Sequence, residues 1–273
     1  MVGRLRQLVV RCYQPRMLLA LATLAGAAVA VPQLVRLTGE VRQQPEYLTA
    51  VREIQLTPPP PHVPRTILAD AIERAGLADP FSKLEPDLAA RLHASLEAEP
   101  WVEAVRGVLV DRGGVQLHLD YRSPALAVAT PTGTFLVDAS GVLLPTDSAD
   151  MLDLDALPRL DGTQRAPISP AGQRWRNETI VQAAAVTTQL GELWAVCGFV
   201  AVRPDADRRW TLVHRSGTLV AWGAADAVAT EPTPAQKRQR LEELLAARGS
   251  LDGPLRVDLT RWDVIALEPL TVR

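Results

Sequence analysis

The sequence predicts an α+β protein in which a single N-terminal transmembrane helix precedes two folded domains. The first observation is an uncharged apolar run at residues 17–35. The second is a strand–helix–helix–strand–strand order over residues 47–122, and the third is a mostly antiparallel β pattern with two helices from residue 124 onward. At 273 residues, 47% of them hydrophobic and 22% charged, the chain is long enough for two modest domains and an anchor.

The apolar run consists mostly of Leu, Ala and Val. At ~1.5 Å per residue it reaches roughly 28 Å, which is close to the thickness of a bilayer core. The segment before it contains no acidic residue. The positive-inside rule therefore predicts a cytoplasmic tail at residues 1–16, an anchor at residues 17–36, and the rest of the chain outside the cytoplasm. The basic residues of the tail are Arg4, Arg6, Arg11 and Arg16.

The same run also fits a signal peptide, because Ala28-Val29-Ala30 forms an A-x-A pattern after an apolar stretch of suitable length. Cleavage after Ala30 would release the remainder as a secreted or envelope binding module that serves transport or assembly. Both alternatives place the bulk of the chain across the membrane, and the sequence leaves both open.

Composition and motifs indicate no enzyme, no cofactor, no metal site and no small-molecule substrate. A net charge of −2 gives no general attraction to nucleic acid. No catalytic or metal-ligand motif includes the histidines, Cys12 or Cys197. The acidic segment 147–155 lacks the spacing of a calcium loop and is interpreted as a solvated loop. Glutamates follow the basic cluster around Lys237 and Arg240, which favours a solvated helix face.

The first folded unit is predicted from turn and cap signals between apolar segments. Its expected elements are a strand at 47–56, a helix at 67–75 capped by Thr66, a second helix from Pro86 to about residue 98, and a hairpin at 102–122. Between the second helix and the hairpin, Pro100, Trp101 and Val102 form a corner. We expect these three residues to be structural, because an aromatic side chain at a helix–strand corner most simply fills the core.

The second unit is predicted to be mostly β. Its expected elements are a hairpin over 135–144 with a turn at Asp138–Gly141, a helix over 173–191, a strand over 196–202, a hairpin over 210–222, a helix that starts at the Thr233–Gln236 capping box and stops at Gly249, and strands at 255–259 and 264–267.

These elements, in this order, resemble the bacterial cell-division family FtsQ/DivIB. Pro100-Trp101-Val102 looks like the "PWV" corner of that family, and Val257-Asp258-Leu259 resembles its late "VDLR". Three features depart from the family pattern: the loop after the first strand is unusually Pro-rich, the usual glutamate is missing at Tyr121-Arg122-Ser123-Pro124, and Thr260 precedes the arginine after "VDL". The other matching stretches are Val115 to Tyr121, Leu136-Val137-Asp138 with Gly141, Leu157-Pro158-Arg159-Leu160-Asp161-Gly162, and Trp210-Thr211-Leu212 with Gly217.

The resemblance implies a POTRA domain at residues 47–123 and an FtsQ-type β domain at residues 124–273. It also implies a non-enzymatic, bitopic scaffold of the divisome at the septum of the inner membrane. Such a scaffold links early and late division proteins and regulates septal peptidoglycan synthesis. The implied partners are FtsB/DivIC-like and FtsL-like bitopic division proteins.

In that family the partner adds to the β domain near its last strands, and an exposed strand edge offers main-chain hydrogen bonds for such an addition. Arg261 and Trp262 are the expected anchors, because Arg and Trp are enriched among interface hot spots. The alternative, that Trp262 is ordinary core and Arg261 an ordinary surface charge, remains open. The predicted strip covers residues 255–267, and the partner-binding residues named within it are Val257, Asp258, Leu259, Arg261 and Trp262.

Overall fold

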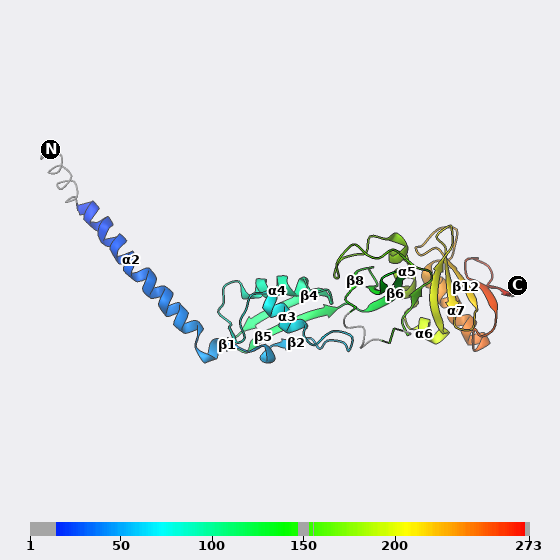
Figure 1. Ribbon diagram of the computed structural model, residues 1–273, viewed down its shortest axis with the longest axis horizontal. Coiled ribbons are helices and arrows are strands. Elements are labelled where there is room, and N and C mark those ends of the chain that lie inside the picture. Colours follow the sequence, from blue (N-terminus) through cyan, green and yellow to red (C-terminus); the bar gives the residue numbers. More distant parts are fainter. Residues whose placement is uncertain (1–14, 147–152, 155, 271–273) are drawn as a thin grey trace, which may run out of the picture.

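The computed structural model describes residues 15–146, 153–154 and 156–270 (Figure 1). Most of the predicted cytoplasmic tail and most of the acidic segment 147–155 lie outside the described residues. Helix α2 (Pro15–Arg42) covers the predicted anchor and extends away from the rest of the chain in Figure 1. Across the described residues, however, no helix combines the length and the apolarity needed to cross a membrane.

The first unit contains a two-stranded sheet and a three-stranded sheet. In the first, β1 pairs with β3; in the second, β2 runs parallel and β4 antiparallel to the central β5. Helices α3 and α4 bury Ile67, Leu92 and Leu96 in one core with the sheet residues Val115 and Leu117. The elements are η1 (Pro45–Tyr47), β1 (Leu48–Thr49), η2 (Val51–Glu53), β2 (Gln55–Leu56), α3 (Ile67–Arg74), β3 (Phe81–Ser82), α4 (Leu88–Glu97), β4 (Val102–Asp111) and β5 (Gly114–Tyr121).

Three predictions for this unit need correction. The strand expected at 47–56 is broken by η2, because the Glu53 carboxylate accepts the backbone N–H of Ala50 and the Asp79 carboxylate accepts that of Val51. Thr66 has a helical backbone and makes no side-chain cap to α3. The second helix begins at Leu88 instead of Pro86, since Asp87 adopts a left-handed conformation (φ 54°).

The second unit is built on one nine-stranded sheet with the order β14-β13-β12-β11-β10-β9-β6-β7-β8. Most neighbours are antiparallel, but β9 runs parallel to both β6 and β10, and β12 runs parallel to β13. The strands are β6 (Pro124–Thr130), β7 (Gly133–Asp138), β8 (Leu143–Leu144), β9 (Arg159–Leu160), β10 (Phe199–Pro204), β11 (Trp210–His214), β12 (Leu219–Gly223), β13 (Leu255–Asp258) and β14 (Ala266–Pro269).

Helices α5 (Glu178–Leu190) and α7 (Pro234–Arg248) pack on one face of this sheet, and their buried apolar residues share a core with Leu212, Val220 and Val257. The short helix α6 (Leu193–Cys197) replaces the start of the strand predicted at 196–202. Glycines with positive φ at 191 and 198 bracket α6, and Trp194 and Cys197 are buried, so the turn is fixed by packing that the strand pattern does not reveal. The predicted α+β class is confirmed.

Candidate functional site

The two ends of the large sheet differ in how their backbone groups are satisfied. Beyond β8, the segment 172–175 runs alongside the strand. The N–H of Leu143 donates to Gln173 O at 2.9 Å, and that of Gly172 donates to Leu143 O at 2.8 Å. At the other end, β14 pairs with β13 alone. Of the two ends of this nine-stranded sheet, the β14 end is therefore the one that no other described segment covers.

The register of β14 identifies the backbone groups on this free edge. The N–H of Leu270 donates to Pro254 O, and Arg256 lies opposite Glu268. Hydrogen-bonded pairs alternate with non-hydrogen-bonded pairs in an antiparallel ladder. The N–H and C=O of Leu267 consequently point away from β13, whereas Pro269 has no N–H to offer. The free edge thus presents one complete donor–acceptor pair at Leu267.

Exposed apolar side chains lie on β14 and in the turn that precedes it. Trp262 is 56% exposed, Val264 48% and Leu267 41%. Leu267 stands opposite Val257, so its side chain lies on the sheet face that α7 covers, where Ile265 is partly buried against the core. Apolar area gathered beside unpaired backbone groups is the combination that an added strand can bury.

The residues named within the predicted strip 255–267 divide into a buried and an exposed group. Val257 and Leu259 are fully buried in the core, so their side chains are not available to a partner. Arg261 and Trp262 are exposed, which removes the alternative that Trp262 is ordinary core. Whether the exposed pair binds a partner stays a prediction.

Asp258 shapes the turn after β13. One oxygen of its carboxylate, Oδ1, accepts hydrogen bonds from the Thr260 N–H at 2.9 Å and the Thr260 hydroxyl at 2.7 Å. Its Oδ2 lies 3.5 Å from Nε of Arg261. Burial alone raises the pKa of Asp258, but the hydrogen bonds from Thr260 and the charges of Arg261 and Arg209 outweigh burial, so the pKa lies below its ordinary value. Asp258 is therefore a turn-forming residue.

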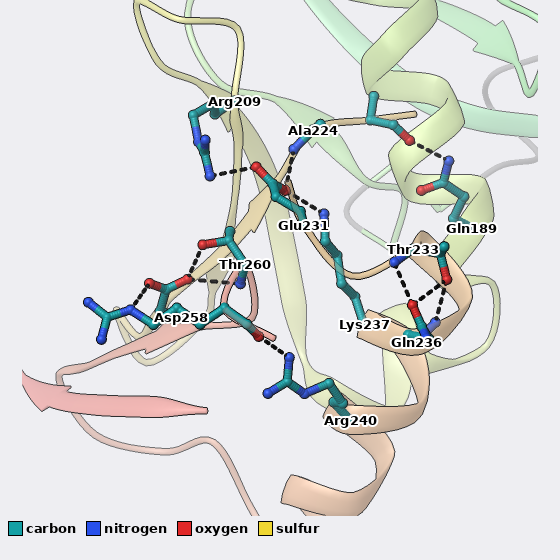
Figure 2. A network of polar contacts seen from close by, with 12 residues as sticks. Gln189, Arg209, Ala224, Glu231, Thr233, Gln236, Lys237, Arg240, Asp258 and Thr260 are labelled. Carbon is teal, nitrogen blue, oxygen red and sulfur yellow. Dashed lines mark hydrogen bonds and ion pairs between the residues drawn. The ribbon is translucent and has the colours of Figure 1, made fainter. Parts of the chain in front are cut away.

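A buried polar network supports this turn from the side of α7 (Figure 2). Lys237 is fully buried, and its Nζ donates to Glu231 Oε2 at 2.8 Å. The same carboxylate receives the Ala224 N–H at 3.1 Å and an ion pair from Arg209 at 2.6 Å. From the next turn of α7, Arg240 donates to the backbone carbonyl of Arg261. The sequence-based interpretation of Lys237 as part of a solvated face is therefore wrong.

The sequence of this second unit matches a known family. The family model for the C-terminal domain of the cell division protein FtsQ/DivIB covers residues 125–260. The chain belongs to the FtsQ/DivIB family. No curated protein matches the chain. FtsQ/DivIB proteins are non-enzymatic cell division proteins, which connects the chain with cell division. The matched region ends at Thr260, just before Arg261, Trp262 and strand β14.

The remaining geometry of this FtsQ/DivIB chain contains no assembled catalytic site in its described part. No group of three or more His, Cys, Asp and Glu side chains in that part could hold a metal ion. Burial raises the pKa of the Cys197 thiol to about 12, so it is not a nucleophile at neutral pH. A hollow of about 580 Å³ at the start of α5 includes Arg174, Trp175 and Arg176 but no nucleophile paired with a base.

The corner of the first unit is buried, as a structural role requires. Trp101 is 2% exposed, its ring centroid lies 5.6 Å from that of His62, and Val102 is buried beside it in the same core. A side chain on Gly172 would lie 3.3 Å from Cα of Pro100, so the corner abuts the segment that covers β8. The contribution of these residues to folding stays a prediction.

The predicted strip 255–267 includes Val264 and Leu267 but does not single them out as contact residues, and sequence reasoning missed Arg240 altogether. Leu267 belongs to an apolar pattern that also describes an internal strand, and only the sheet order makes β14 the last strand. Arg240 lies among charged residues of α7, and its neighbour Arg238 pairs with Glu242 on the exposed surface. The burial of Lys237, by contrast, has a signal in the sequence. Lys237 lies four residues after the capping threonine Thr233 and four before Leu241, so the three residues share one face of the helix.

Proposed function

We propose that this FtsQ/DivIB chain is a division scaffold that accepts an extended segment of a partner protein along the free edge of β14. The observation that carries this proposal is the unpaired outer edge of β14, with exposed Leu267 on the strand and exposed Trp262 and Val264 in the turn before it. Main-chain hydrogen bonds to an edge strand give affinity to such an addition, and flanking side chains give specificity.

The backbone groups of the β14 edge also limit where along this strand a partner can form hydrogen bonds. Leu267 supplies both a donor and an acceptor, whereas Pro269 supplies only an acceptor. A partner strand therefore gains most of its hydrogen bonds from Leu267 toward the turn that precedes β14. An apolar side chain of the partner next to Leu267 would complete the cover of the sheet face beside α7. The proposed partners are FtsB/DivIC-like and FtsL-like bitopic proteins.

The experiment measures binding of the full-length chain, in detergent or nanodiscs, to the FtsB/DivIC-like protein of the same organism. Leu267→Pro is the decisive variant, because it removes the outward N–H and leaves the bonds of Ala266 and Glu268 to β13 in place. We expect at least tenfold weaker binding, and a similar loss for Trp262→Ala. Val228→Ala, an exposed apolar residue elsewhere in the same unit, is the control. Wild-type affinity in both edge variants would reject the proposal.

We further propose that residues 17–36 anchor the chain, with residues 1–16 in the cytoplasm and the bulk outside. The support is the uncharged run itself and the exposure of Leu19, Leu21 and Leu24 around α2, which leaves this surface without protein cover within the described residues. Cleavage after Ala30 is the alternative. Epitope tags at both ends, followed by membrane fractionation, separate the two: absence of the N-terminal tag from the mature protein would remove the anchor.

In this proposal residues 47–123 form a POTRA domain and residues 124–273 an FtsQ-type β domain, located at the septum. Contacts through these domains regulate septal peptidoglycan synthesis. Depletion of the protein is expected to block division and produce filaments. Normal division together with a leaking envelope would instead favour the alternative of a POTRA-type module for transport or assembly.

A further inference from the structure

The turn between β13 and β14, residues 258–264, is held firmly over its first half. Asp258 closes it through Thr260, as described above. Leu259 is fully buried and its N–H donates to Ala221 O at 3.1 Å. The methyl group of Thr260 lies where a side chain on Gly223 would come within 2.8 Å of it. These contacts of Asp258, Leu259 and Thr260 hold the backbone of the turn in place up to Thr260.

Beyond Thr260 the turn is exposed, and different contacts hold its backbone. Residues 261–264 are all exposed, and this stretch includes Trp262 and Val264. Two contacts hold its start: Arg240 donates a hydrogen bond to the backbone carbonyl of Arg261, and the Arg261 side chain pairs with Asp258 Oδ2 at 3.5 Å. Figure 2 shows Arg240 reaching from α7 toward the turn. Because the bond is made to a backbone atom, it fixes the path of the chain at the point where Trp262 begins.

Arg240 is itself well placed to hold the turn. It lies one helical turn after Lys237, whose buried ion pair with Glu231 fixes α7 against β12 and the loop that follows it. The helix start is closed by the Thr233–Gln236 capping box. A guanidinium group presents several donors in a rigid plane, so it loses less freedom than a flexible ammonium when it holds a carbonyl.

We propose that Arg240 is a positioning residue for partner binding: it presets the turn before β14, so that Trp262 is held in one place before the partner arrives. This inference rests on the function proposed for β14. The role follows from preorganisation, since a turn that is already ordered does not have to be ordered by binding. Arg240 acts through the carbonyl of Arg261 and does not contact the partner.

The test compares Arg240→Gln, Arg240→Lys and the control Arg238→Gln in the full-length protein. Arg238 lies on the same helix, and its pair with Glu242 is exposed. Two quantities are measured: amide hydrogen exchange of residues 261–264 in the free protein, and the Kd for the FtsB/DivIC-like protein. For Arg240→Gln we expect about tenfold faster exchange and about tenfold weaker binding. Arg240→Lys should fall between it and wild type, and Arg238→Gln should change neither quantity.

Any other combination of the exchange and binding results overturns the inference. Unchanged exchange means that Arg240 does not order the turn, and weaker binding with unchanged exchange means that it touches the partner directly. Faster exchange with an unchanged Kd means that turn order does not matter for binding. Failure of the proposed function is distinguishable, because Leu267→Pro would then bind like wild type whatever the exchange data show for Arg240.

Discussion

The buried network around Glu231 predicts an unequal cost for removing its two central members. The Glu231 carboxylate serves three donors: Lys237 Nζ at 2.8 Å, Arg209 at 2.6 Å and the Ala224 N–H at 3.1 Å. Replacing Glu231 with Gln leaves the fully buried Lys237 ammonium without an anion. Removing one partner of a buried ion pair typically costs ~3–5 kcal/mol. Replacing Lys237 with Met leaves the carboxylate with Arg209 and Ala224.

We therefore expect Glu231→Gln to lower the free energy of unfolding by ~3–5 kcal/mol and Lys237→Met by a smaller amount, about 1–2 kcal/mol, because a methionine fills the same space without a charge. The double variant should be more stable than Glu231→Gln alone. The assay is urea unfolding followed by tryptophan fluorescence, since Trp222 lies 5.7 Å from Lys237 Nζ. A Lys237→Met variant as unstable as Glu231→Gln, or a double variant less stable than both, would refute this reasoning.

Three further predictions concern single positions. Gly223→Ala should destabilise the protein more than Gly217→Ala, because both have positive φ (83° and 88°) but only a side chain at 223 would overlap Glu231, and thermal unfolding of the pair checks this. Trp101→Ala should cost ~3–5 kcal/mol in urea unfolding, and normal stability with lost partner binding would contradict its structural role. The lowered pKa of Asp258 adds stability above the unfolded value of about 3.9 that disappears as the pH falls through the folded value. The stability advantage of wild type over Asp258→Asn should therefore shrink between about pH 5 and pH 3, and a constant difference would exclude the predicted linkage.

Local sequence signals predicted the elements that local contacts stabilise. The capping box at Thr233 and Gln236 forms as expected, because donor and acceptor are three residues apart. The turn at Asp138–Gly141 joins β7 to β8, with Gly141 at φ 76°. In both cases the residues that decide the geometry are close in the chain, so their spacing is sufficient evidence.

Predictions from the sequence failed where contacts between residues far apart in the chain determine the local structure. The N–H of Val51 is taken by Asp79, which lies 28 residues away, and this contact helps to break a segment with strand-like composition. Lys237 is buried because Glu231 and Trp222 surround it in the folded chain. A charged residue in a charged helix segment carries no sign of such an environment, since burial of a charge depends on the carboxylate that meets it.

The sequence by itself determined the α+β class and the motifs that resemble FtsQ/DivIB. The family match over residues 125–260 confirms the family. The tertiary structure decided which strand edge is free. Segment 172–175 covers β8, and β14 has no outer neighbour in the described chain. Strand order depends on long-range pairing, which alternating apolar residues do not specify, so the open edge at Leu267 could be located only in the folded molecule, whereas Trp262 was already predicted from the sequence.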